Sequence, residues 1–433
     1  MAKKDLMEGE YAVSTSRLGR LFKTGRSAVG LARTVLGRRD AEVDLEAIGA
    51  LTRRLGELKG LAMKAGQILS FIDPTLPPEM RELLSVLQRQ APASEAAAVR
   101  QTIVDAFGAR AEVLLAAMDP KPLSVASIGQ VHRAHLQGYG ELAVKVLHPG
   151  IKTALEKDFS TAFGGLGFAN TLLLGAASDA KAIAEEARRA VMAECDFAQE
   201  AAYQREYFTW LKGDDTLIVP EVIDAWSSET VLTTRWEPGE PLEVFLAGNP
   251  TQAERDRAGA ALFRASVRGF HELGLLHGDP HPGNYAFREG RVVLYDFGCV
   301  RRFTREQTGA FAEMAEALRA NDRPRMVGAA RRFGFHLESA EGEQLLERFA
   351  RSFFAPMLKE GPSVMPADLA FEAKQIMKDK LALMKLGLPP HILFLLRLRF
   401  GLYAVLSRIG ARCDWAALEA MPTAKVARSG PPP

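Results

Sequence analysis

The sequence is poor in cysteine and lacks long apolar runs, and each absence excludes a class of protein. The three cysteines are odd in number, far apart in the chain and without C-x-x-C spacing. This distribution argues against a disulfide framework or a zinc site and fits a reducing compartment. No stretch reaches the roughly 18 consecutive apolar residues of a membrane-spanning helix. The best candidate, Ile392 to Ile409, contains Arg397, Arg399 and Arg408, so we predict a buried amphipathic helix there.

A strong excess of either charge is also missing. The formal net charge is +2 over 433 residues, which argues against a general nucleic-acid-binding protein. The N-terminus lacks an apolar core after its lysines, so the sequence does not predict a secretory signal. With 47% hydrophobic residues, the chain can build a sizeable core, in two domains or in one large bilobal domain.

Two short motifs in the second half of the chain are typical of phosphoryl transfer. Asp279 and Asn284 have the D-x-x-x-x-N spacing of a kinase catalytic loop, and Asp296 begins the D-F-G sequence that follows it. The segment 291–295 between them is predicted to be a short strand. Asp279 would orient the attacking oxygen, while Asn284 and Asp296 would hold Mg²⁺ against the phosphate oxygens. The ordered spacing disfavours the alternative, a coincidental loop and turn.

A lysine-bearing strand and the turn before it match the phosphate-binding part of a kinase. Ala143-Val144-Lys145 fits the V-A-I-K pattern, whose lysine binds the α- and β-phosphates and pairs with a helix glutamate. The preceding turn stands in the place of a glycine-rich loop but keeps only Gly129. Small side chains can still bring backbone N–H groups close to a phosphate, with less freedom in φ than glycine gives. The residues predicted to contact the nucleotide here are Ser124, Val125, Ala126, Ser127, Gly129 and Lys145.

The glutamate partner of Lys145 is expected on a long helix over 179–210. Glu194, Asp196 and Glu200 are the candidates. On a continuous helix Glu194 and Asp196 project about 200° apart, whereas Glu200 lies about 40° from Asp196. This spacing is compatible with two different roles on one helix. The alternative is an acidic helix face exposed to solvent.

The remaining elements follow from hydrophobic periodicity and from capping residues. The segments 219–223 and 230–236 are predicted to be paired strands, followed by a hinge whose backbone, at Glu237, would hydrogen-bond an adenine. There is no A-P-E sequence and no long polar segment typical of an activation loop. Instead, a helix is predicted to start near Thr304, an N-cap with Gln307 at N3. Further helices are predicted over 43–70, 79–90, 94–107, 151–177 and 255–273. The segment 122–134 is predicted to be a strand, a small-residue turn and a second strand, and 141–147 the next strand.

A basic segment near the N-terminus leaves two interpretations open. Residues 16–39 contain seven lysines and arginines, no acidic residue, and interspersed apolar residues. This pattern is typical of an amphipathic helix on an anionic membrane surface. A helix packed on the domain behind it, with solvated charges, explains the pattern equally well, and four glycines lower its helix propensity.

Together these motifs resemble the UbiB/ADCK (AarF-like) family of atypical protein-kinase-like proteins, in particular the branch associated with coenzyme Q. The resemblance extends from about Arg17 to Trp415. Besides the motifs above, it includes the family's K-x-G-Q at Lys64 to Gln67 and its E-x-D at Glu194 to Asp196. These two motifs together are highly specific to this family.

The resemblance implies the fold. We expect an α+β, bilobal protein-kinase-like structure with a small mixed N-lobe sheet, a mostly helical C-lobe and an N-terminal helical extension folded over the active-site cleft. The expected divisions are a basic, membrane-surface segment (1–40), a helical K-x-G-Q extension (41–118), an N-lobe with a helical insertion (119–237), a C-lobe (238–420) and a disordered tail (421–433).

The resemblance implies roles for individual residues as well. Lys145 would bind the phosphates and pair with Glu200. The extension would close the cleft to a polypeptide but leave room for a nucleotide and water or a small lipid-like molecule, with Lys64 facing the acids of the E-x-D motif. The implied residues are Asp279, Lys145 and Glu200 in catalysis, Asn284 and Asp296 as metal ligands, and Lys64, Gln67, Glu194 and Asp196 in regulation.

The implied activity is that of an Mg²⁺-dependent ATPase that supports isoprenoid-quinone (ubiquinone) biosynthesis at a membrane, rather than a protein kinase acting in trans. ATP and Mg²⁺ would be the cofactors. The implied partners are ATP or ADP, a quinone precursor or anionic lipid, and quinone-biosynthesis enzymes, with no nucleic acid. The protein would be a monomer or a homodimer, cytoplasmic and peripheral at the inner membrane surface.

Two alternative functions remain open. The segment His277 to Asn284 also resembles the H-G-D-x-H-x-x-N loop of aminoglycoside and choline kinases, which would make the protein a small-molecule phosphotransferase. A non-catalytic nucleotide-sensing scaffold would keep the same motifs.

Two positions depart from the expected patterns. The segment 124–127 replaces the family's alanine run followed by serine, which leaves the nucleotide preference open. Gly278 replaces the arginine of the kinase H-R-D sequence, which argues against activation by phosphorylation.

Overall fold

The computed structural model describes residues 93–126, 128–164, 188–189, 191–366, 387–389 and 391–420. The chain splits into two compact units. Unit 1 comprises Met1–Leu173, Ala187–Phe197 and Ile223–Thr233, and unit 2 comprises Leu174–Glu186, Ala198–Val222 and Thr234–Pro433. The basic segment 16–39, the predicted helices 43–70 and 79–90, Lys64, Gln67 and Ser127 all lie outside the described residues.

Unit 1 contains a four-stranded sheet in the order β1-β2-β3-β5. The strands predicted over 122–134 and 141–147 are present, and the antiparallel register sets Val131 opposite Lys145. Thus β2 pairs with β1 across the small-residue turn on one side and with the lysine strand β3 on the other. The strands are β1 (Ser124–Val125), β2 (Gly129–Leu136), β3 (Gly140–Leu147) and β5 (Val231–Arg235), the last two residues of which belong to unit 2.

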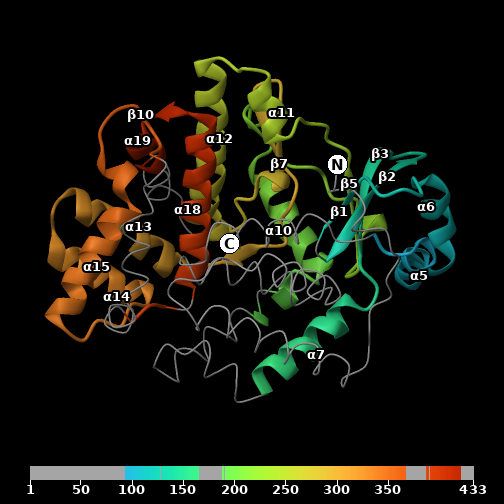
Figure 1. The fold of residues 1–433 in the computed structure, drawn as a ribbon, viewed down its shortest axis with the longest axis horizontal. Coiled ribbons are helices and arrows are strands. Elements are labelled where there is room, and N and C mark those ends of the chain that lie inside the picture. The colour runs from blue at the N-terminus through green and yellow to red at the C-terminus, as the bar shows by residue number, and fades with distance from the viewer. Residues whose placement is uncertain are drawn as a thin grey trace, which may run out of the picture. The chain divides into compact units, whose positions relative to one another are not determined.

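Helices α5 and α6 lie against this sheet (Figure 1), and the apolar face of α5 supplies part of the core between them. Val99, Ile103 and Phe107 are spaced four residues apart, so they lie on one side of the helix, and all three are buried. The ring of Phe107 meets that of Trp226 edge-on, with 5.5 Å between the centroids. The helices of unit 1 are α5 (Ala96–Phe107), η1 (Gly108–Arg110), α6 (Ala111–Ala117), α7 (Ile151–Gly164) and η2 (Asp224–Trp226).

The prediction of one continuous helix over 179–210 is wrong. The backbone N–H groups of Cys195 and Asp196 donate to carbonyl groups three residues back, which closes a tight turn. The N–H of Phe197 donates instead to the carbonyl of Glu229 at 3.0 Å. This bond to a distant segment replaces the helical bond to residue i−4, and the helix is therefore interrupted here.

A new helix, α10 (Phe197–Trp210), follows the interruption. Asp196 precedes its first residue, at the N-cap position where aspartate is favoured. Glu194 lies in the turn. The helical angles that related Glu194 and Asp196 to Glu200 therefore do not apply, and Glu200 alone of the three lies on a helix.

Unit 2 is mostly helical and carries three small sheets, β4-β8-β7, β6-β9 and β10-β11. Only β4 and β8 pair in parallel; the other described pairs in these sheets are antiparallel. The strands are β4 (Leu217–Ile218), β6 (Leu275–His277), β7 (Tyr285–Arg288), β8 (Arg291–Leu294), β9 (Val300–Arg302), β10 (Ser363–Val364) and β11 (Arg412–Cys413). The helices after α10 are α11 (Leu242–Ala247), α12 (Gln252–Arg268), the π-helix η3 (Gly269–Leu273), η4 (Pro282–Asn284), α13 (Arg305–Arg319), α14 (Arg323–Phe333), α15 (Ala340–Phe353), η5 (Ala355–Leu358), α18 (Ile392–Ile409) and α19 (Trp415–Ala420).

Several predicted element boundaries are confirmed because they rest on local chemistry. Helix α13 begins after Thr304, whose hydroxyl accepts from the N–H of Gln307 while the Gln307 side chain accepts from the Thr304 N–H. This reciprocal pair is the predicted capping box.

The segment 219–223 is not a strand, although it bonds to β5 as expected, through the isolated bridge between Val222 and Thr234.

Helix α18 has the predicted bounds, and most of its described apolar side chains are buried. Arg399, a buried charge on this helix, is neutralised by an ion pair. Arg399 donates from both terminal nitrogens to the carboxylate of Glu419, at 3.0 and 3.1 Å, and both side chains are buried. The guanidinium carbon lies 5.0 Å from the centroid of the Phe353 ring. Burial alone would raise the pKa of Glu419, but the charge of Arg399 and the hydrogen bonds from His271 and Arg399 together lower the pKa to about 2. In the described part of the chain, no helix is long and apolar enough to cross a membrane.

We expect Glu419→Ala to destabilise the protein by about 3–5 kcal/mol, because it leaves the Arg399 charge buried and unpaired. The lowered pKa of Glu419 means that the folded state binds its proton less readily than the unfolded state. The stability that ionised Glu419 contributes is therefore fully present at neutral pH. It is lost as the pH falls below the ordinary carboxyl range toward about 2. Urea unfolding of both proteins between pH 7 and pH 3 measures this, and the difference between them should shrink toward acid pH.

The matched control for this prediction is Glu243→Ala. Glu243 accepts two hydrogen bonds from Arg408 at 2.7 and 2.8 Å, but its side chain is 70% exposed. Removing such an exposed pair should cost less than about 1 kcal/mol. A similar cost for both substitutions would contradict the importance of the buried pair.

Candidate active site

The catalytic-loop motif begins where β6 parts from β9. The two strands pair antiparallel up to His277, and the N–H of Gly278 then donates to the carbonyl of Cys299 at 2.9 Å. A Cβ atom at position 278 would lie 2.7 Å from that carbonyl oxygen. This close approach leaves no room for a side chain, which is a physical reason for the absence of the arginine found in H-R-D.

Hydrogen bonds inside the loop fix the path from Asp279 to Asn284. The N–H of His281 donates to the Asp279 carboxylate at 3.4 Å, and the N–H of Gly283 donates to Nδ1 of His281 at 3.0 Å. The N–H of Asn284 donates to the carbonyl of His281 at 3.0 Å. His281 therefore makes structural hydrogen bonds within the loop.

The predicted metal ligands Asn284 and Asp296 are brought to the same end of a two-stranded ribbon. β7 and β8 pair antiparallel with Tyr285 opposite Leu294, and the N–H of Tyr295 donates to the carbonyl of Asn284 at 2.8 Å. Asn284 thus lies opposite Tyr295, the neighbour of Asp296.

The chemistry of these two side chains fits Mg²⁺. The amide nitrogen of Asn284 is directed at the carbonyl of Asp279 at 3.5 Å, which leaves its amide oxygen as the candidate ligand atom. One carboxylate oxygen of Asp296 accepts from the N–H of Gly298 at 3.0 Å. Mg²⁺ prefers such hard oxygen donors, usually one or two carboxylates together with water and phosphate oxygens. Within the described residues, no group of three or more histidine, cysteine, aspartate or glutamate side chains is arranged to hold a metal ion.

His277, which the sequence interpretation assigned no role, holds the backbone of Asp296. Its Nε2 lies 2.6 Å from the Asp296 carbonyl oxygen, which can only accept, so this nitrogen carries the proton. Burial lowers the pKa of His277 despite the opposing charge of Asp296, and the imidazole is therefore neutral near pH 7. The ring meets Phe297 edge-on, with 5.2 Å between the centroids. The sequence feature that could have indicated this role is a histidine at the end of a short apolar strand, β6.

Glu200 lies beside the D-F-G backbone in unit 2. It is 2% exposed, in the first turn of α10, and its carboxylate accepts from the N–H of Phe297 at 3.4 Å. A Cβ atom at Gly298 would lie 3.4 Å from the other carboxylate oxygen. The carboxylate therefore packs closely against the residues that follow Asp296.

Lys145 belongs to unit 1, where its ammonium group lies 4.9 Å from the centroid of the Phe197 ring. Glu194 and Asp196 are also in unit 1, and both are half-buried in the turn before α10. The pairing of Lys145 with Glu200 stays a prediction.

The turn before the lysine strand is held by polar contacts within unit 1. His148 Nε2 lies 3.1 Å from the carbonyl oxygen of Ala126, and its Nδ1 lies 2.7 Å from the hydroxyl of Ser94. A Cβ atom at Gly129 would lie 2.6 Å from the carbonyl oxygen of Val146. Gly129 is therefore required by the close approach of β2 and β3, whatever further role it has with a nucleotide.

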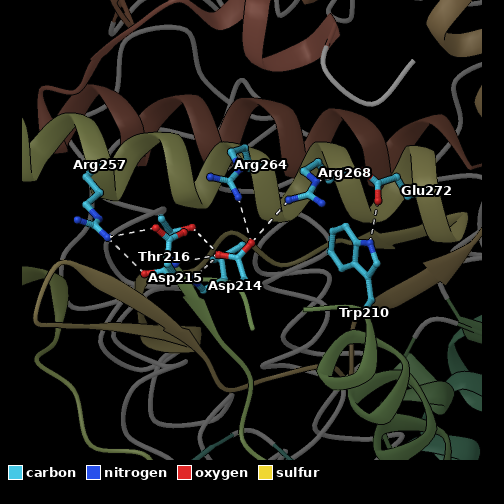
Figure 2. Close-up of polar contacts among 9 residues, drawn as sticks. Trp210, Asp214, Asp215, Thr216, Arg257, Arg264, Arg268 and Glu272 are labelled. Carbon is cyan, nitrogen blue, oxygen red and sulfur yellow. Dashed lines mark hydrogen bonds and ion pairs between the residues drawn. The ribbon is translucent and has the colours of Figure 1, made fainter. Parts of the chain in front are cut away.

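The C-terminal half of α10 is anchored to the helix that precedes the catalytic loop (Figure 2). The Tyr207 hydroxyl donates to the carbonyl of Leu275 at 3.0 Å, and the indole N–H of Trp210 donates to the carboxylate of Glu272 at 2.8 Å. The guanidinium carbon of Arg268 lies 5.1 Å from the centroid of the Trp210 ring, within cation–π range.

Asp214 continues this anchor beyond the end of α10, as Figure 2 shows. Its carboxylate accepts from the N–H and hydroxyl of Thr216 and from Arg264 of α12, at 2.8, 2.7 and 3.1 Å. A guanidinium nitrogen of Arg268 lies 3.6 Å from a carboxylate oxygen of Asp214. The side chain is only 10% exposed. Burial would raise its pKa, but the hydrogen bonds from Thr216 and the charge of Arg264 lower it, so Asp214 is ionised near pH 7.

Known proteins resemble this chain in sequence and in fold. The profile of the ABC1 atypical kinase-like domain matches residues 86–330. The chain belongs to this family. It is 28% identical over 356 residues to the mitochondrial atypical kinase coq-8 of Caenorhabditis elegans, which covers 75% of this chain and 46% of that protein. It is 27% identical over 442 residues to the mitochondrial atypical kinase COQ8 of Saccharomyces cerevisiae, with 96% and 86% covered.

A solved structure shows the same fold. The Rv3197–erythromycin complex of Mycobacterium tuberculosis superposes with a TM-score of 0.58 at 25% identity, over 94% of this chain and 98% of that chain. The expected UbiB/ADCK-type family and the α+β, bilobal kinase-like fold are thereby confirmed. The chain spans less than half of the worm relative's length and most of the yeast relative's.

We expect Asp214→Asn to lower stability by about 1–3 kcal/mol, because Thr216 and Arg264 bind different carboxylate oxygens and the amide nitrogen must face the donors of one of them. Hydrogen exchange of the α10 amides should rise in the same variant, since the end of the helix loses its anchor. The control is Asp215→Asn, whose side chain is 83% exposed and lies 3.8 Å from Arg257. The control should change stability by less than about 0.5 kcal/mol. Unchanged hydrogen exchange of the α10 amides in Asp214→Asn would contradict the role of Asp214 in anchoring this helix.

Proposed function

We propose that this protein binds ATP with Mg²⁺ and catalyses transfer of the terminal phosphoryl group, with water as an acceptor. The observation that carries the proposal is the pairing of β7 with β8, which sets the oxygen ligands Asn284 and Asp296 at one end of the ribbon, next to the loop of Asp279. Membership of the ABC1 atypical kinase-like family supports the same reaction class.

Each proposed residue has a distinct task. Asp279 orients the attacking oxygen and accepts its proton, and Glu200 with Lys145 fixes the α- and β-phosphates. Mg²⁺, held by Asn284 and Asp296, would neutralise charge on the phosphate oxygens. The turn residues Ser124, Val125, Ala126, Ser127 and Gly129 direct N–H groups to the phosphates, and the backbone at Glu237 meets the base.

We infer that the activity supports isoprenoid-quinone biosynthesis at a membrane surface. The two relatives described above are named mitochondrial atypical kinases, coq-8 and COQ8. A quinone precursor or an anionic lipid would be the stimulating ligand, and the basic segment 16–39 would meet the lipid. Lys64 and Gln67, with the half-buried Glu194 and Asp196, would regulate access to the site.

A small-molecule phosphotransferase is the second candidate. One observation favours it: the structural relative from Mycobacterium tuberculosis was solved in complex with erythromycin, a small molecule. Such an enzyme would turn over ATP faster when an acceptor is present and would leave a phosphorylated product that mass spectrometry detects.

The test is phosphate release by the purified protein with MgATP, with and without anionic liposomes. We expect release that rises with anionic lipid in the wild type and falls by about 100-fold or more in Asp296→Asn, because the variant loses a charged metal ligand at the site of charge development. Asp215→Asn, with its exposed side chain, is the matched control and should retain wild-type release.

Wild-type ATP binding and hydrolysis in Asp296→Asn would show that the site assignment is wrong. Release that neutral liposomes stimulate as strongly as anionic ones would contradict the membrane part of the proposal. Release that appears only with an added small-molecule acceptor would favour the second candidate.

A further inference from the structure

Tyr295, the residue before the metal-ligand Asp296, connects three parts of the candidate site in unit 2. Its backbone N–H donates to the carbonyl of Asn284 at 2.8 Å. Its side chain reaches in another direction, and the phenol hydroxyl donates to the carbonyl oxygen of Glu237 at 2.8 Å. One residue therefore contacts both the metal-ligand pair and the hinge segment that we propose meets the nucleotide base.

The hinge is held close to the ribbon at this point. Glu240 and Phe287 of β7 exchange two backbone hydrogen bonds, both of 2.8 Å. A Cβ atom at Gly239 would lie 2.6 Å from Cβ of Ala286 and 3.2 Å from the Tyr295 hydroxyl. Glycine is therefore the residue that allows this approach, and the hinge carbonyl has little freedom to move away from Tyr295.

Charged side chains lie around the Tyr295 hydroxyl. Burial raises its pKa above the ordinary value, although the nearby charge of Arg288 opposes this. Arg288 in turn forms an ion pair of 2.8 Å with the Glu237 carboxylate. The side chain and the carbonyl of Glu237 are thus both restrained, by Arg288 and by Tyr295.

We propose that Tyr295 is a positioning residue that makes the site selective for adenine over guanine nucleotides. A carbonyl oxygen only accepts hydrogen bonds, so it attracts the 6-amino group of adenine and repels the 6-oxo group of guanine. The Glu237 carbonyl belongs to the peptide bond before Pro238, which has no N–H to offer a 6-oxo group in its place. Because the hydroxyl of Tyr295 holds this carbonyl in position, the repulsion cannot be relieved by movement. The inference rests on the proposed nucleotide-binding function.

The two lone pairs of a carbonyl oxygen allow this arrangement. One accepts from Tyr295, and the second is available to the amino group of a base. Phenylalanine at this position would keep the ring and its packing while removing the donor. The Glu237 carbonyl could then shift, and discrimination against the 6-oxo group should weaken.

The experiment measures binding of ATP and of GTP separately, with Mg²⁺, by competition with a fluorescent ATP analogue on the full chain. In Tyr295→Phe we expect the ratio of GTP to ATP dissociation constants to fall by roughly 3- to 10-fold, the effect of one hydrogen bond. The control is Tyr403→Phe, which also removes a tyrosine hydroxyl donating to a backbone carbonyl, that of Phe353, at 3.0 Å. Its ratio should equal that of the wild type, since Tyr403 is not part of the site.

The selectivity ratio separates positioning from stability. A role confined to stability would lower the melting temperature of Tyr295→Phe and leave the ratio unchanged, which would overturn the inference. ATP binding in the wild type together with an unchanged ratio leaves the proposed function standing and removes only the role of Tyr295. Absence of ATP binding in the wild type would overturn both. If Tyr295→Phe does not fold, Tyr295→Leu, which matches the aliphatic residues of β8, takes its place with the same expectation.

Discussion

The antiparallel pairing of β7 with β8 is the constraint on which the candidate site depends. Asn284 belongs to the catalytic-loop motif and Asp296 to the D-F-G motif. The two residues come to the same end of the ribbon because Tyr285 lies opposite Leu294 and the N–H of Tyr295 donates to the carbonyl of Asn284. A slip of one residue would send the side chains to opposite faces and separate the two oxygen ligands. The buried imidazole of His277 adds a second restraint by holding the carbonyl of Asp296.

Helix α10 belongs to the same framework in unit 2. Its first turn presents Glu200 to the N–H of Phe297, and its end is joined to the helices before the catalytic loop through Trp210 and Asp214. In a kinase whose glutamate helix swings between states, activity is gated by that movement. Here the hydrogen bonds of Glu200, Tyr207 and Trp210, with those of Asp214 beyond the helix end, oppose such a movement within unit 2. Control of activity is therefore better sought elsewhere, as in the proposed regulatory residues outside this helix.

The sequence predicted those features that local chemistry specifies. The capping box at Thr304, the bounds of α18 and the short strand before Asp296 each depend on neighbouring residues, and each is present. The break before α10 was not predictable in this way, because it arises when the N–H of Phe197 bonds to Glu229, a residue distant in sequence. The roles of Tyr295 and His277 were missed for the same reason, since their partners are carbonyl groups that carry no sequence signal.

The central claim is that Asn284 and Asp296 form one metal site in the presence of nucleotide. The most direct measurement is electron paramagnetic resonance of Mn²⁺, in place of Mg²⁺, with a non-hydrolysable ATP analogue bound to the wild type and to Asn284→Leu. The account predicts that the protein–nucleotide complex holds Mn²⁺ about 10- to 100-fold more weakly in the variant, because one oxygen ligand is lost. Equal Mn²⁺ affinity in the two proteins would contradict it.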